Sequence, residues 1–459
     1  MTQLLHHGGH LALLGLGGPS AEEPLDVGVI TFAALLVAAV VVSLLVRRLP
    51  VPYVTALAIA GAALGTIGSQ LRPHVTSSLI LFIVLPGLLF ESAFTLDWGR
   101  LRRDLVPVVL LATAGVAVTM AVIALLGHEW LGLGIPLAIL LGAAVAPTDP
   151  VAVVAVFRRL GVPRRLATLV EAESLLNDGT GVVAFGIALA AVTGGGLGVA
   201  DAVLSFVRLA GGGIALGLAI GFVLSRLTRR IDDQQVELTY TAIGAYGTYV
   251  LADALQVSGI LAVVAAAIVL GNDGRSHGMS ERTRAAVDVV WGYAAFLLNS
   301  LIFLLIGLSE PIPDILRNLG PVMAAAAITL VARAASVYLL LPAGSRRRAL
   351  PWRWRHLVVW SGMRGAVAIA LILSLPSGVP GIAQVRTLVY GVVLVTIVVQ
   401  GGTVAPLARW LLAPAHRDGG RGAEPPAPGR RDGRPGRRSS TPGAGPPPAA
   451  ADGGGAPPE

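Results

Sequence analysis

The amino-acid sequence predicts an all-α polytopic membrane protein, and three observations lead to this fold class. The chain has 459 residues, of which 54% are apolar and only 13% are charged. The mean hydropathy is +0.76, a value typical of integral membrane proteins. Apolar stretches near 20 residues long recur along the chain, and in lipid such stretches satisfy their backbone hydrogen bonds as helices.

About thirteen transmembrane helices are predicted from these apolar stretches. They cover residues 27–46, 53–68, 79–95, 105–126, 135–157, 166–190, 203–224, 236–254, 259–270, 287–308, 320–341, 356–375 and 385–412. Residues 1–26 lack the basic start of a signal peptide and are expected to form an extracytoplasmic N-terminal stub.

The loops between these helices alternate in arginine content. Loops after odd-numbered helices hold twenty arginines, and loops after even-numbered helices hold three. Because basic residues gather on the cytoplasmic side of a membrane, the alternation predicts a multi-pass plasma-membrane protein. Its N-terminus is expected outside the cell and its C-terminus in the cytoplasm.

Residues 413–459 are predicted to form a disordered cytoplasmic tail. Gly and Pro make up 21 of the last 45 residues, so no core can form there. The arginines of the tail could touch anionic lipid or nucleic acid, but a solvated tail is the simpler interpretation, and no nucleic-acid partner is expected.

The first candidate site lies in the middle of the predicted helix 135–157, where two prolines surround Thr148 and Asp149. Proline interrupts a helix, so we expect free backbone groups at mid-membrane depth. Asp149 could compensate the N-terminal end of the second half-helix, and Thr148 could offer oxygen atoms to a cation. The alternative is a simple proline kink that Asp149 caps.

Four polar side chains lie on one face of the predicted helix 166–190, namely those of Glu173, Ser174, Asn177 and Asp178. Oxygen atoms of this kind suit hard cations such as sodium. A carboxylate at this depth, Asp178, could hold either a proton or a cation, which is the minimum requirement for exchange. The alternative is a polar cluster that only holds helices together.

Two arginines also lie inside apolar stretches. Gly362 and Gly365 flank Arg364 and indicate a second broken helix, in which Arg364 would neutralise C-terminal helix ends. Arg333 is a plausible partner for Glu173, because an ionisable group at this depth needs an opposite charge. For either arginine, the alternative is a side chain that reaches back to the membrane interface.

Glu91 lies near the end of the predicted helix 79–95, and Asp97 follows at the cytoplasmic edge. Both fit an entry funnel for a cation, and both fit the ordinary polarity of a membrane interface equally well.

Three motifs together resemble the monovalent cation:proton antiporters, specifically the bacterial sodium/proton exchangers related to the animal exchangers. They are Pro147-Thr-Asp-Pro150, Glu171-Ala-Glu-Ser-Leu-Leu-Asn-Asp178 and Gly362-Met-Arg-Gly365. The resemblance covers residues 27–412. It implies a homodimer that works by elevator-type alternating access, with inverted repeats and crossed discontinuous helices.

The resemblance also implies a division of the membrane region and roles for its residues. A core transport domain would comprise residues 105–190 and 320–412, a dimerisation domain 27–95 and 236–308, and a linker helix 203–224. The implied roles are exchange at Asp178, cation contacts from Thr148, Ser174 and Glu173, support from Asn177, balance of helix ends by Asp149 and Arg364, and an ion pair of Glu173 with Arg333. The Asn177–Asp178 pair looks like that of the family's electroneutral members.

The expected activity is exchange of a monovalent cation for a proton, with Na⁺ favoured over K⁺ or Li⁺. A cation channel is the first alternative, although polar residues gathered at two breaks suit an occluded site better than a continuous pore. An enzyme is disfavoured, since the sequence shows no nucleophile with a paired base, no metal-ligand spacing and no lysine for a phosphate loop. No cofactor is expected.

Overall fold

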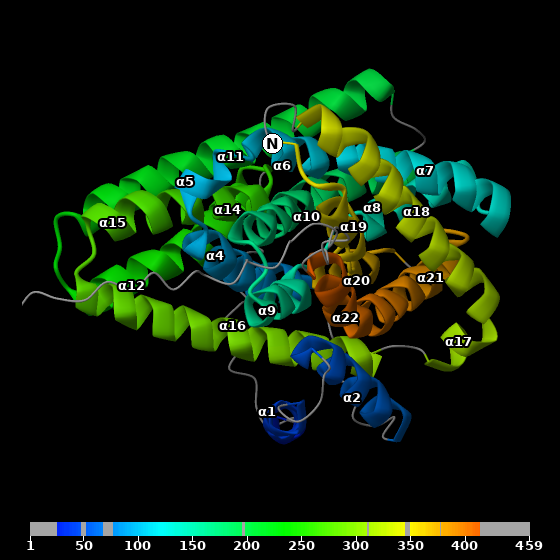
Figure 1. Ribbon diagram of the computed structural model, residues 1–459, viewed down its shortest axis with the longest axis horizontal. Helices are drawn as coiled ribbons and strands as arrows, with labels where there is room; N and C mark the ends of the chain where they lie inside the picture. The colour runs from blue at the N-terminus through cyan, green and yellow to red at the C-terminus, as the bar shows by residue number, and fades with distance from the viewer. Residues whose placement is uncertain are drawn as a thin grey trace, which may run out of the picture. The chain divides into compact units, whose positions relative to one another are not determined.

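The computed structural model describes residues 25–46, 52–67, 77–194, 198–309, 312–344, 349–376 and 378–413, and all regular structure in these residues is helical (Figure 1). The predicted tail, apart from Ala413, lies outside the described residues. So does the predicted N-terminal stub, apart from its last two residues, which already belong to the first helix.

Each of the predicted transmembrane ranges overlaps a helix or a pair of helices. In the first half of the chain these helices are α1 (Leu25–Val46), α2 (Tyr53–Ile67), α3 (Ser77–Leu79), α4 (Leu85–Thr95), α5 (Trp98–Leu101), α6 (Leu105–Ala112), α7 (Ala114–Leu131), α8 (Ile135–Val145), α9 (Val151–Leu160) and α10 (Arg164–Thr193).

The second half continues with α11 (Val199–Thr228), α12 (Gln234–Ala242), α13 (Thr248–Ala254), α14 (Gly259–Val269), α15 (Arg275–His277), α16 (Glu281–Ser309), α17 (Ile312–Arg317), α18 (Leu319–Gly344), α19 (Trp352–Trp360), α20 (Ala366–Leu373), α21 (Ile382–Val395) and α22 (Gly401–Leu412). Within the described residues, eight continuous helical stretches are long and apolar enough to cross a membrane. The count of thirteen crossings stays a prediction.

Several helix ends differ from the prediction. The helix α16 begins at Glu281, six residues before the predicted start, and the short helices α5 and α17 were not predicted at all. These segments carry charged residues, so hydropathy alone places them outside the membrane stretches. The helices extend past the apolar run because their backbone hydrogen bonds continue into the polar region.

In the described residues, four helices contain a π-helical turn, a feature that the sequence did not indicate. These turns are η2 (Ile80–Val84), η3 (Ile243–Gly247), η4 (Leu270–Gly274) and η5 (Thr396–Gln400). Each turn joins two α-helical pieces into one continuous rod, such as α21 with α22.

One group of helices packs with its backbones in direct contact. The helix α2 lies along α16, and a Cβ atom at Gly61 would stand 2.2 Å from the carbonyl oxygen of Leu304 (Figure 1). In the same way α11 lies along α14, where a Cβ at Gly217 would stand 2.1 Å from the carbonyl oxygen of Ala262. The helix α4 packs against both α14 and α16. We call these helices (α2, α4, α11, α14 and α16) the frame group.

A second group contains both broken helices. The helix α7 packs against α8 and α18, α18 against α19 and α21, and α9 against α22. The helix α10 packs against α6 and α8 of this group and also reaches α4, α11 and α14 of the frame group. We call the helices α6 to α10 and α18 to α22 the broken-helix group. The helix α10 is therefore an element through which the two groups meet.

Candidate functional site

Two helices are broken at the positions that the sequence motifs indicated. The first break lies between α8, which ends at Val145, and α9, which begins at Val151. The second lies between α19 and α20, over residues 361–365. The two breaks are bonded to each other, because the backbone N–H of Asp149 donates to the carbonyl oxygen of Met363 at 2.8 Å.

The ends of the half-helices are matched by opposite charges. The carboxylate of Asp149 accepts hydrogen bonds from the backbone N–H of Val151, at 2.9 Å, and from that of Ala366. It therefore sits at the positive N-terminal ends of both α9 and α20.

Arg364 acts at the opposite kind of helix end. Its Nη1 donates to the carbonyl oxygens of Ala146 and Pro147 at 2.9 and 3.1 Å, just past the C-terminal end of α8. The side chain is only 1% exposed, and the backbone N–H of Arg364 is held by the hydroxyl of Thr396 at 3.1 Å. The charges of Asp149 and Arg364 thus compensate the partial charges of the broken helices.

Thr148 connects the first break to α10 through three hydrogen bonds. Its backbone N–H donates to Asn177 Oδ1 at 3.1 Å, and its hydroxyl oxygen accepts from Asn177 Nδ2 at 2.7 Å. The same hydroxyl lies 2.9 Å from that of Ser174. All three side chains are buried. The unwound segment is therefore held in a fixed position beside α10.

Glu173 and Arg333 form a two-pronged ion pair between α10 and α18. Both distances from the Nη atoms of Arg333 to the carboxylate oxygens are 2.8 Å. The side chains are 6% exposed for Arg333 and 1% for Glu173. Asn177 Nδ2 also donates to Glu173 Oε1 at 2.6 Å, which joins the ion pair to the Thr148 network. The structure thus brings together seven of the eight candidate site residues that were selected from the sequence.

Asp178, the eighth, is buried but stands apart from this network. It is 6% exposed, and within the described part of the chain no hydrogen bond or ion pair reaches its carboxylate. Its charged neighbours are Asp149, Glu173 and Arg364. It lines a cavity of about 40 Å³ together with Thr148 and Asp149. The unpartnered carboxylate and this cavity form the candidate exchange site.

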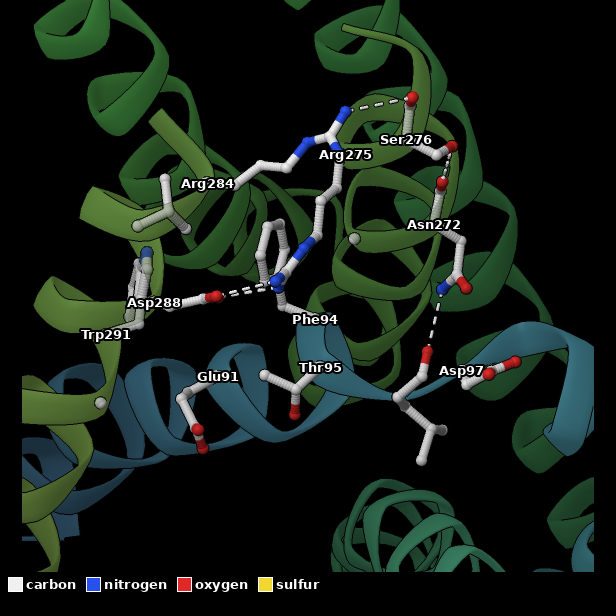
Figure 2. A pocket seen from close by; sticks show the side chains of 14 residues that line it. Glu91, Phe94, Thr95, Asp97, Asn272, Arg275, Ser276, Arg284, Asp288 and Trp291 are labelled. Atoms are coloured by element: carbon white, nitrogen blue, oxygen red, sulfur yellow. Dashed lines mark hydrogen bonds and ion pairs between the residues drawn. The ribbon is translucent and has the colours of Figure 1, made fainter. Parts of the chain in front are cut away.

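Two larger cavities adjoin one another on the side of the arginine-rich loops. One, of about 530 Å³, is lined by Glu91, Asp97 and the bidentate pair of Arg275 with Asp288 (Figure 2). The other, of about 600 Å³, lies between α4 and α5 on one side and α9 and α10 on the other, and Glu171 lines it. Both cavities are lined by Thr95, Leu96 and Asp97, so they meet at that segment.

Three polar residues of the site were not selected from the sequence. Ser92 on α4 and Asn299 on α16 line the cavity of Asp178, and Thr396 holds the backbone of Arg364. A polar residue in the middle of an apolar stretch is the only signal that marks them. This signal is weak for serine and threonine, because their hydroxyls can bond to their own helix.

Broken helices whose ends meet beside a buried carboxylate define a class of protein, the secondary transporters of small ions. The comparisons with known proteins agree with this class and narrow it. The family profile described as "Sodium/hydrogen exchanger, transmembrane" matches residues 34–410. The chain belongs to the sodium/hydrogen exchanger family.

Characterised relatives and solved structures resemble the chain over most of its length. The Na⁺/H⁺ antiporter ApNhaP of Aphanothece halophytica is 40% identical over 357 residues, which cover 77% of this chain and 68% of the relative. The Na⁺/H⁺ antiporter NhaP of Pseudomonas aeruginosa is 37% identical over 348 residues, covering 73% of this chain and 82% of the relative. The sodium proton antiporter MjNhaP1 of Methanocaldococcus jannaschii superposes with a TM-score of 0.68 at 21% identity, over 84% of this chain and 100% of that chain. This structural match shows the fold.

Proposed function

We propose that the protein exchanges Na⁺ for H⁺ across the membrane, and that the two ions compete for the carboxylate of Asp178. The observation that carries the proposal is the position of this carboxylate, buried, without a partner and next to a small cavity at the two helix breaks. The family membership and the relatives named as Na⁺/H⁺ antiporters support the choice of ions.

The charges around Asp178 favour exchange of one cation for one proton. Glu173 is neutralised by Arg333, while Asp149 and Arg364 are balanced by helix ends. Asp178 is then the one carboxylate of this cluster whose charge depends on what it binds. Because it is neutral with a proton and neutral with a monovalent cation, each transport step moves no net charge. We therefore propose that transport is electroneutral.

The cation would contact oxygen atoms on both sides of the cavity. Asp178 supplies a carboxylate, and Thr148 supplies a hydroxyl at the first break, with Ser174 bonded to that hydroxyl. Asn177 orients this pair through its hydrogen bonds to Thr148, and Glu173 in turn accepts a hydrogen bond from Asn177. Oxygen ligands of this kind suit Na⁺, and they suit Li⁺ and K⁺ as well.

The two larger cavities give the proposed access route from the cytoplasm. They lie next to arginine-rich loops, which the positive-inside rule assigns to the cytoplasmic side. Their walls carry charges of both signs, because arginines line them beside the carboxylates of Glu91, Asp97 and Glu171. Within these walls the carboxylates are the groups that attract a cation. In alternating access, the broken-helix group would move against the frame group to open the other side.

We also propose that the protein works in the plasma membrane as a homodimer, with its N-terminus outside. In the first described helix, α1, the side chains of Val37, Val40, Val41, Leu44 and Leu45 are exposed. Such an apolar stripe requires lipid or a second copy of the chain to cover it. In this arrangement α1 and the frame group without α11 would form the dimerisation domain, and α11 would link it to the core.

The experiment that tests the function is cation-driven proton flux in proteoliposomes. Na⁺, Li⁺ and K⁺ are compared for the wild type, Asp178→Asn and a control, Asp253→Asn, whose carboxylate is exposed on α13. We expect flux in the wild type and the control, no flux in Asp178→Asn, and no effect of a clamped membrane potential. Normal exchange by Asp178→Asn would refute the assigned role, and the preferred cation identifies the substrate among the three.

A further inference from the structure

Asn299 contributes an oxygen atom to the exchange cavity from the frame group. It lies in the middle of α16, and it lines the same cavity of about 40 Å³ as Thr148 and Asp178. Its Oδ1 atom is buried and has no hydrogen-bond partner among the described residues. The other polar side chains of this cavity, apart from Ser92 on α4, come from the broken-helix group.

The helix that carries Asn299 is held firmly at this point. The hydroxyl of the next residue, Ser300, lies 2.8 Å from that of Tyr53 on α2 and donates to the carbonyl oxygen of Phe296 at 2.5 Å. Two turns further, a Cβ at Gly307 would stand 2.1 Å from the carbonyl oxygen of Ala58, so the two backbones touch. Asn299 therefore projects from a helix whose backbone is held against that of α2.

A buried amide oxygen without a partner is costly. Leaving such an acceptor unpaired costs about 1–3 kcal/mol, and native structures rarely leave one without a reason. The cavity has room for one small ion or a water molecule, since a water needs only about 10–15 Å³. A cation bound to Asp178 would supply the missing positive charge at Oδ1.

We propose that Asn299 is a ligand of the transported cation, contributed by the frame helix α16. This inference rests on the proposed exchange at Asp178. The cation would then be held between two groups of helices, with the carboxylate on one side and the amide oxygen on the other. The two ligands, the carboxylate of Asp178 and the amide oxygen of Asn299, face the same cavity only in the arrangement described here. Movement of the broken-helix group would therefore remove Asn299 from the coordination shell of the cation. Asn299 would thereby help to determine affinity and cation preference on the cytoplasmic side.

Cation binding to the purified protein in detergent tests this inference without any need for transport. The readout is the rise in unfolding temperature with Na⁺, Li⁺ or K⁺ concentration at alkaline pH, which yields a dissociation constant. We expect Asn299→Ala to weaken Na⁺ binding about tenfold, equivalent to ~1.4 kcal/mol. Asn299→Asp keeps an oxygen at the same reach and should bind Na⁺ at least as tightly as the wild type.

The matched control is Ser300→Ala, a change at the neighbouring residue, which faces α2. This variant should unfold at a lower temperature and keep the wild-type dissociation constant. If it weakens binding as much as Asn299→Ala does, Asn299 acts only by positioning the helix and the inference is wrong. Unchanged Na⁺ binding by Asn299→Ala would overturn it directly.

Three further outcomes are also decisive. If Asn299→Ala does not fold, Asn299→Asp and Asn299→Gln make the same test: tight binding by the first and weaker binding by the second support the inference, and equal binding overturns it. If the wild type shows no proton flux but binds the cation more tightly than Asn299→Ala does, the exchange function fails while the ligand assignment stands. A wild type that binds none of the three cations refutes both.

Discussion

Replacing Glu173 with glutamine would leave a permanent charge buried without its partner. The carboxylate receives two charge-assisted hydrogen bonds of 2.8 Å from Arg333, and neither side chain is more than 6% exposed. A glutamine can accept one of these bonds but presents an N–H group to the other Nη atom. Breaking a buried pair in this way costs about 3–5 kcal/mol, and arginine cannot relieve the strain by losing its proton.

Reversible unfolding in mixed detergent micelles measures this cost as a change in the free energy of unfolding. The pair of Arg275 with Asp288 is the matched control, because it has the same two-pronged geometry, with both distances 2.7 Å, but its side chains are 30% and 44% exposed. We expect Asp288→Asn to cost less than about 1 kcal/mol, as exposed ion pairs do.

The double variant Glu173→Gln/Arg333→Met separates the charge from the packing. It removes both charges, so most of the lost stability should return, to within about 1–2 kcal/mol of the wild type. The reasoning is refuted if Glu173→Gln costs no more than Asp288→Asn. It is also refuted if the double variant is less stable than Glu173→Gln alone.

Other substitutions test the remaining parts of the site. Gly365→Ala would place a Cβ atom 2.1 Å from an oxygen of Asp149, so we expect a loss of about 3 kcal/mol or more in detergent unfolding. Arg364→Met would leave the carbonyl oxygens of Ala146 and Pro147 without their donor and would remove the positive charge near Asp178, so we expect both folded yield and proton flux to fall sharply. Thr148→Val removes a hydroxyl with little change of shape but takes a partner from Ser174 and Asn177, so we expect a loss of about 1–3 kcal/mol in stability and an apparent KM for Na⁺ about tenfold higher. Because proton and cation compete for Asp178, that KM should rise as pH falls, and a pH-independent KM would contradict competition.

The broken helices and their charges could be predicted from the sequence, for a definite physical reason. Proline and glycine interrupt a helix wherever it lies, and a charge at mid-membrane depth needs a partner. Since few ionisable residues lie in the apolar stretches, the possible partners were few. The structure pairs Arg333 with Glu173 and places Arg364 on the carbonyl ends of the first break.

Asn299 and the tight helix pairs could not be predicted in this way. An asparagine in an apolar helix points toward lipid, a neighbouring helix or a cavity according to how that helix is rotated, and hydropathy does not fix the rotation. The glycines between α2 and α16 do not indicate this close helix contact either, because glycine occurs in membrane helices for several reasons. Such features depend on which helices meet, and that is decided by the packing of the whole protein.

The bonds of Arg364 to the first break have a consequence for how the chain is made. They join residues 217 and 218 positions apart, so the first break enters the membrane long before its partner has been synthesised. Until then, the exposed carbonyls and Asp149 require water or the insertion machinery to satisfy them. A ribosome-bound chain that ends before α19 should therefore hold an open, hydrated first half. Docking of α19 and α20 is then the late step of biogenesis that expels this water.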